Sequence, residues 1–190
     1  MKFIGFLNKE NQTAFNVSGY KSVVKDNPFC LMSASEDFKN NFSHCTKNNI
    51  HIILFGNIKA GGLQSKDILS FFIEKYLSAG IEFFNLLDGS FIIILWDRQK
   101  KILYIRRDSY GTKLLYYHFS NDSGLAFSNN LDTLLRFTGP QSISKKALYE
   151  YLRFLDISPP YTIYEDIYSL DPEKILIAKQ NEIILKDICF

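Results

Sequence analysis

Residues 91–96 form an unbroken run of β-branched, aliphatic and aromatic side chains, Phe-Ile-Ile-Ile-Leu-Trp. A strand with one face in water would alternate apolar and polar residues, and this run does not. The run is also far too short to cross a bilayer. It therefore predicts a strand that is covered on both faces, and so a fold built of stacked layers.

Further strands are predicted around this one by short apolar runs between turn residues. They are residues 1–7, 51–55, 102–105, 114–119, 125–128, 175–178 and 182–185, with turns at 121–124 and 180–181. The strands from 91–96 to 125–128 are expected to form one antiparallel meander. Residues 8–27 have the composition of loops and edge strands, and residues 38–49 that of a polar connection.

Two helices are predicted by apolar residues at helical spacing. The first begins at Lys66 and ends with Gly80 as a left-handed cap; its apolar residues are Ile68, Leu69, Phe72, Ile73, Tyr76 and Leu77. The second is capped by Ser144 and ended by Pro159-Pro160; its apolar stripe is Leu148, Tyr151, Leu152 and Leu155. Because no repeat or linker divides the chain, we expect one α+β domain over residues 1–190, with sheet packed on sheet.

Charge and cysteine usage exclude several classes of function. The 22 basic and 20 acidic residues are spread along the chain without the basic stripe of a nucleic-acid-binding protein. No membrane segment or signal peptide is found, so we expect a cytoplasmic protein. Cys30, Cys45 and Cys189 lack metal-ligand or redox spacing, and His44 and Cys45 would point to opposite faces of a strand. No metal site and no cofactor are expected.

Two segments in the middle of the chain carry a resemblance to a known family. They are Leu-Asp-Gly-Ser-Phe-Ile-Ile-Ile-Leu-Trp-Asp at 87–97 and Arg-Asp-Ser-Tyr-Gly-Thr-Lys-Leu-Leu-Tyr-Tyr at 107–117. Together they resemble the type II glutamine amidotransferase domain of asparagine synthetases, in which a Leu-x-Gly-x-Phe strand entry precedes an Arg-Asp-x-x-Gly-x-Lys-Pro-Leu-Tyr-Tyr segment. Leu114 stands where that family usually has proline.

The similarity continues through the segments 125–128, 151–167 and 170–177, although Asn129 replaces an acid and Glu173 a glycine. It covers residues 50–190 well and the first 49 poorly. The resemblance implies a four-layer αββα N-terminal nucleophile fold with two stacked antiparallel sheets. It also implies an ATP-dependent synthetase domain following at about residue 190, which is absent from this chain.

The resemblance implies that the glutamine chemistry is missing. Lys2 stands where the family exposes its nucleophilic cysteine, and an ammonium is no thiolate. The family clamps the substrate carboxylate with an early arginine, but the first arginine here is Arg98. Phe55 replaces the oxyanion-hole asparagine in the segment 55–58, and Ser65 replaces the aspartate that binds the substrate amine, although Asp67 keeps a charge nearby.

No catalytic residue is therefore expected, and the preserved motif residues are candidates for a remnant pocket or a structural motif. They are Phe55, Gly56, Asn57, Asp88, Gly89, Arg107, Asp108, Gly111 and Lys113. Their simplest role is structural: internal pairing of the charged residues and the shaping of a turn. The segment 56–62 lacks the Gly-Lys-Ser/Thr ending of a phosphate-binding loop, so ATP chemistry must lie elsewhere.

Three functions follow as hypotheses. The first is an inactive glutaminase-like domain that docks on, or is fused to, an asparagine-synthetase-like, ATP-dependent amide-forming enzyme. Similar domains occur in β-lactam synthetases and lasso-peptide cyclases, where the substrate supplies the amine. The second is an amidohydrolase that uses Cys30 or Cys45 as its nucleophile. The third is a stand-alone module whose former glutamine pocket, lined by Phe55, binds a peptide or small ligand.

Overall fold

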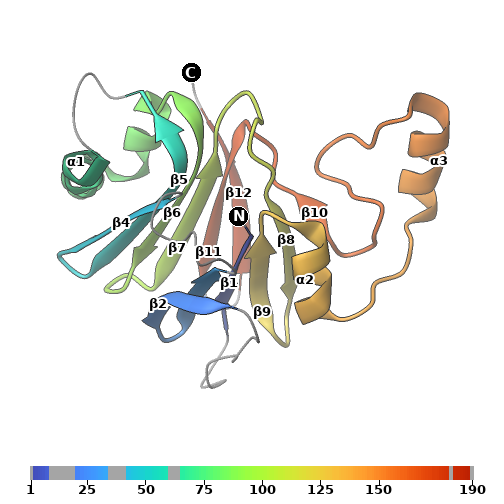
Figure 1. The fold of residues 1–190 in the computed structure, drawn as a ribbon, viewed down its shortest axis with the longest axis horizontal. Coiled ribbons are helices and arrows are strands. Elements are labelled where there is room, and N and C mark those ends of the chain that lie inside the picture. The colour runs from blue at the N-terminus through green and yellow to red at the C-terminus, as the bar shows by residue number, and fades with distance from the viewer. Residues whose placement is uncertain (1, 9–19, 34–41, 60–64, 180–181, 189–190) are drawn as a thin grey trace. The chain divides into compact units, whose positions relative to one another are not determined.

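The computed structural model describes residues 2–8, 20–33, 42–59, 65–179 and 182–188 (Figure 1). The chain divides into two compact units. The first comprises Met1–Ser35 and Leu114–Asp171, and the second Glu36–Lys113 and Pro172–Phe190. Each unit therefore combines two separate stretches of sequence, and each contains one six-stranded antiparallel sheet.

The sheet of the first unit has the strand order β10-β8-β9-β1-β3-β2. Its strands are β1 (Phe3–Leu7), β2 (Lys21–Asp26), β3 (Phe29–Ser33), β8 (Tyr116–Ser120), β9 (Gly124–Ser128) and β10 (Tyr168–Ser169). Strand β1 lies inside the sheet between β3 and β9, and all five of its residues are buried. Helix α2 (Leu131–Thr138) places Leu134 on a core that includes Ile4, Phe6 and Met32. The second helix of this unit is α3 (Lys145–Phe154).

The sheet of the second unit has the order β12-β11-β7-β6-β5-β4. Its strands are β4 (Phe42–Lys47), β5 (Ile50–Ile58), β6 (Gly89–Asp97), β7 (Ile102–Arg107), β11 (Lys174–Lys179) and β12 (Glu182–Asp187). Helix α1 (Ser65–Ala79) and the 3₁₀ helix η2 (Gly80–Leu86) pack on one face of this sheet (Figure 1). Their largest shared cluster joins Leu69, Phe72 and Phe84 to Phe91 and Ile93 of β6.

Several sequence predictions are confirmed. Every residue from Phe91 to Asp97 is buried, as expected for a strand covered on both faces. The hairpin β8–β9 and the hairpin β11–β12 form as predicted, although the turn at 180–181 lies outside the described residues. Gly80 follows α1 with φ +63°, and the Ser144 hydroxyl accepts the Ala147 N–H at the start of α3. No helix in the described part of the chain is long and apolar enough to cross a membrane.

Two predictions about the sheets are wrong. Within residues 38–49, expected to be a polar connection, the segment 42–47 forms strand β4, which pairs with β5 along its whole length. The expected meander is also divided: β6 and β7 belong to one sheet, β8 and β9 to the other, and residues 108–115 connect them. Strand β4 could not be predicted from composition, because none of its residues is fully buried. The division of the meander could not be predicted either, because sheet membership depends on long-range pairing.

Candidate functional site

The preserved motif residues all belong to the second unit, where β5 ends, β6 begins and the loop after β7 folds back. The antiparallel register places Gly56 opposite Phe91, and Asn57 opposite Ser90. The loop reaches the same place, because Thr112 Oγ1 lies 2.6 Å from Ser90 Oγ. The fold thus brings together motif residues that are more than 50 positions apart in the sequence, from Phe55 to Lys113.

Two glycines allow the backbones of β5 and β6 to approach closely. Gly56 has φ +95°, and a Cβ built there would collide with the Ser90 carbonyl and lie 3.3 Å from Lys113 Cε. Gly89 has φ +143°, and its Cβ would collide with the Asn57 carbonyl. Only glycine combines these angles with this proximity. Both glycines are therefore required by the close pairing of β5 and β6, whether or not a ligand binds there.

Asp108 organises the loop that follows β7. It is fully buried, and its Oδ1 accepts the Thr112 N–H at 2.9 Å. Its Oδ2 accepts the Thr112 hydroxyl at 2.9 Å and the Lys113 N–H at 3.1 Å. The Asp108 N–H donates to the Phe91 carbonyl, which ties the loop to β6. Both carboxylate oxygens thus hold the loop, as expected of a structural turn.

Arg107 and Gly111 complete this turn. Arg107 is only 4% exposed, and its Nη1 donates to the Lys113 carbonyl at 3.1 Å. A Cβ on Gly111 would lie 3.2 Å from Arg107 Nη2, and Gly111 has φ +66°. The glycine therefore leaves the room that the guanidinium occupies. The turn is thus held by contacts among four residues, Arg107, Asp108, Gly111 and Lys113.

Asp88 lies apart from that hydrogen-bond network, on the surface. Its Oδ2 is 2.9 Å from Lys59 Nζ, and its carbonyl accepts the Lys59 N–H at 2.8 Å. The hydrogen bond from Lys59 lowers the pKa of the Asp88 carboxyl. This exposed pair links the end of β5 to the entry of β6, and exposed pairs of this kind contribute little to stability.

The residues at which the resemblance predicts lost chemistry lie in different parts of the structure. The Phe55 ring is buried and lies 5.7 Å from the Phe42 ring, while Asn57 is exposed. In the first unit, exposed Lys2 precedes β1, where the Phe3 N–H donates to Asn129 Oδ1. Arg98 lies in the exposed turn after β6. Helix α1 begins at Ser65. The side chains of residues 65–67 and the whole of residue 64 lie outside the described part of the chain.

The described thiols lie in separate environments. Cys45 lies against α1, with Sγ 3.5 Å from Ser70 Oγ. His44 stacks on His51 at 5.7 Å, on the other face of the strand, so the prediction that His44 and Cys45 diverge is confirmed. Burial raises the pKa of the Cys30 thiol. Cys189 lies outside the described residues, among which no group of three or more His, Cys, Asp or Glu could hold a metal.

Sequence reasoning missed Arg106, which precedes the matching motif. It is fully buried, its Nη2 donates to Ser109 Oγ at 3.1 Å, and its guanidinium lies 5.7 Å from the centre of the Phe91 ring. Burial lowers its pKa to about 10. Its Nε and Nη1 have no hydrogen-bond partner among the described residues. Sequence alone gave no signal for this residue, because arginines are ordinarily exposed.

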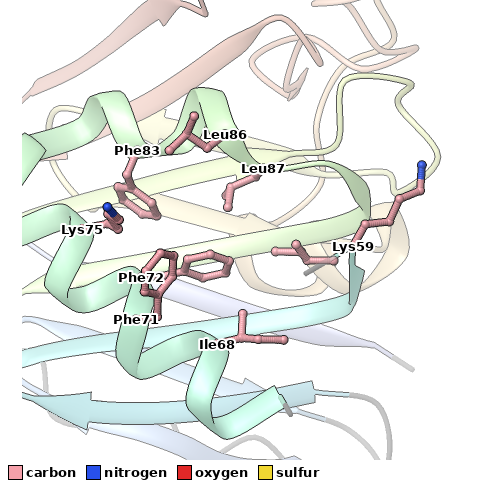
Figure 2. Close-up of a pocket in the computed structure, with 9 residues that line it drawn as sticks. Lys59, Ile68, Phe71, Phe72, Lys75, Phe83, Leu86 and Leu87 are labelled. Carbon is pink, nitrogen blue, oxygen red and sulfur yellow. The ribbon is translucent and has the colours of Figure 1, made fainter. Parts of the chain in front are cut away.

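One pocket of about 170 Å³ lies between α1, η2 and the end of β5 (Figure 2). It is mostly apolar, with two lysines among its lining residues: Ile58, Lys59, Ile68, Phe71, Phe72, Lys75, Phe83, Leu86 and Leu87. Phe55 does not line it, nor do the residues of the Asp108 turn. This pocket therefore lacks Phe55, which the binding-module hypothesis places in its binding pocket.

Comparison with known proteins agrees with the motifs. Residues 67–188 match the family model of the glutamine amidotransferase domain. The chain is 30% identical over 101 residues to asparagine synthetase [glutamine-hydrolyzing] 1 of Bacillus subtilis (strain 168), covering 53% of the chain and 16% of that protein. It is 31% identical over 150 residues to amidase chyE of Penicillium rubens, covering 73% of the chain and 22% of that protein.

The fold comparison agrees with the predicted class. Glutamine phosphoribosylpyrophosphate amidotransferase from B. subtilis superposes with a TM-score of 0.50 at 11% identity, over 85% of this chain and 35% of that one. The chain has two antiparallel sheets and few helices. Together with this likeness, that composition confirms the predicted α+β, N-terminal nucleophile fold. The chain belongs to the glutamine amidotransferase domain family and is related to the asparagine synthetases.

Proposed function

We propose that this chain is a catalytically inactive glutaminase-like domain that serves as a structural or docking part of an asparagine-synthetase-like, ATP-dependent amide-forming enzyme. The observation that carries the proposal is Lys2, at the position where the resemblance requires a cysteine nucleophile. A lysine side chain at that position supplies no thiol to attack the amide. Phe55 adds a second loss, because its buried ring has no N–H to stabilise an oxyanion.

The preserved half of the motif supports a structural role. Asp108, Arg107 and Gly111 engage one another and the neighbouring backbone through short contacts. This arrangement supports the proposal, because it gives these residues a role that needs no catalysis: they hold β6 and the following loop together. The curated relatives are much longer, and the chain spans only 16% to 22% of the two described above. An ATP-dependent partner, in the same chain or a separate one, is the inferred context.

The first test is affinity capture of the intact protein from its native host, with intact-mass analysis and an assay of ATP-dependent amide formation. We expect either a longer chain or a stoichiometric partner, in both cases with ATP consumed as an amide forms. A lone 22.0 kDa species without such activity would contradict the proposal. That result would favour the stand-alone binding module.

The competing amidohydrolase hypothesis needs an activated thiol, and Cys30 tests it. Because burial raises its pKa, its thiolate fraction at neutral pH is below that of a free cysteine. We expect iodoacetamide at pH 7.5 to label Cys30 in the native protein more than about tenfold more slowly than in the urea-unfolded chain, which serves as the matched reference. Peptide mass spectrometry measures both rates. Faster labelling in the native state would instead indicate an activated nucleophile.

A further inference from the structure

Helix α3 exposes nearly its whole apolar surface. Leu148, Tyr151, Leu152 and Leu155 follow the i, i+3, i+4, i+7 spacing of a buried helix face, yet their exposures range from 40% to 78%. Tyr149 and Phe154 are also exposed, and Ala147 is the single buried residue of the helix. Soluble monomers rarely expose contiguous apolar patches of more than a few hundred Å², and larger ones mark interaction sites.

This helix is nevertheless held firmly at its base. Ile143 and Tyr164 form a β-bridge, the Ser144 N–H donates to the Ile163 carbonyl at 2.9 Å, and the Glu165 N–H donates to the Ser142 carbonyl at 2.8 Å. Within the first unit, α3 stands away from α2 and strands β8 and β9 (Figure 1). A ten-residue helix is marginal without tertiary packing. The paired segments therefore present α3 outward as a preformed element.

The charges on α3 indicate the chemistry of its partner. Lys145 and Lys146 occupy the first turn and Arg153 the last, with Glu150 as the one acid within the helix. Two lysines beside the positive end of the helix dipole disfavour the isolated helix. Lys146 is held over the Tyr161 ring at 4.1 Å, so this charge is positioned. Carboxylates on a partner would complement these basic residues.

A second copy of this chain fits the surface poorly. In an antiparallel pair of α3 helices packed through the stripe, Lys145 would meet no acid of the other copy, because Glu150, two residues after Leu148, lies on the opposite side of the helix. In a parallel pair Lys145, which shares a helix face with Leu148 and Leu152, would lie beside its own copy. Like charges placed together disfavour association, so a different, acidic surface fits better.

We propose that α3 is the docking surface for an apolar protein surface bordered by Asp and Glu side chains, located on the ATP-dependent part of the enzyme. The identity of that partner rests on the function proposed above. The family match includes α3. The two curated relatives are much longer than this chain, and we place the surface that covers α3 in the part that corresponds to their additional length. The leucines and aromatic residues provide the apolar contact, and the basic residues set the orientation.

Site-specific photo-crosslinking of the intact protein in its native host tests this directly. A benzoyl-phenylalanine is placed at Leu152, 72% exposed on α3, or at Leu77, 52% exposed on α1, as the matched control. We expect at least about tenfold more adduct from position 152, joined to an apolar, acid-rich segment of an ATP-dependent protein or domain. Adducts with lipid or with a second copy of this chain, or equal yields at both positions, would overturn the docking surface.

Substitutions provide the second measurement. Leu152→Glu and the double change Lys145→Glu, Lys146→Glu should each weaken retention of the captured partner at least about tenfold, whereas Leu77→Glu should not. All of these side chains are exposed, so the single leucine variants should keep the circular dichroism spectrum and the melting temperature. The double variant should not lower the melting temperature, because glutamates in the first turn favour the helix. Normal retention of an ATP-dependent partner by Leu152→Glu would refute the docking surface alone. An adduct at 152 with a protein that lacks ATP-dependent activity would refute the proposed function alone.

Discussion

Replacing Gly56 by alanine is expected to destabilise the protein by about 3 kcal/mol or more. The backbone there has φ +95°, and the new methyl group would collide with the Ser90 carbonyl, a main-chain atom of the paired strand. A main-chain atom cannot rotate away as a side chain can, so β5 and β6 would have to separate. Urea denaturation followed by circular dichroism measures the loss.

Gly80→Ala is the matched control for this prediction. Gly80 also has a positive φ, +63°, but a Cβ built there meets nothing within 4 Å. Its cost is therefore the backbone strain alone, about 1 kcal/mol. Equal losses for the two variants would show that the close approach at Gly56 is unimportant, and the motif glycine would then require another explanation.

The second large effect is expected for Asp108→Ala, a loss of about 3 kcal/mol. The change removes the acceptor for the Thr112 N–H, the Thr112 hydroxyl and the Lys113 N–H in a buried turn. Asp108→Asn should be less harmful, because the amide keeps one oxygen acceptor. Urea denaturation again provides the measurement.

Asp88→Ala serves as the comparison for the Asp108 variants. Asp88 is also a preserved acid of the motif, but its exposed carboxylate pairs with the exposed Lys59. We expect no measurable change in its urea midpoint, because solvent screens such pairs. A large loss at Asp88 together with a small one at Asp108 would contradict the assignment of the structural role to the buried turn.

The sequence predicts the parts of the fold in which local pattern and burial agree. Residues 91–96 of strand β6 are all apolar and all buried. Gly80 and Ser144 mark helix ends because a left-handed glycine and a capping hydroxyl are local signals. Helix α2 was missed because it has only eight residues, of which just Thr133 and Leu134 are buried. Strand β2 was hidden by its exposed lysines, and β3, Phe-Cys-Leu-Met-Ser, contains no β-branched residue to mark it as a strand.

The candidate site was only partly predictable. The motif identified Gly56, Asp108 and Arg107, but not Ser90 and Thr112, whose hydroxyl groups join the loop to β6. Serine and threonine are common on any surface, so only the folded register shows that these two meet. The exposure of the α3 stripe could not be predicted either, because its sequence spacing is the same as that of a buried helix.

Glutamine hydrolysis by the purified, intact protein tests the central claim most directly. Glutamate release is measured beside asparagine synthetase [glutamine-hydrolyzing] 1 of B. subtilis as the active control. The proposal places Lys2 and Phe55 at the positions of the nucleophile and the oxyanion donor, so it predicts no glutamate above the buffer blank, with Lys2→Cys also remaining at the blank. Glutamate release that scales with protein concentration and is abolished by thiol alkylation would contradict the account.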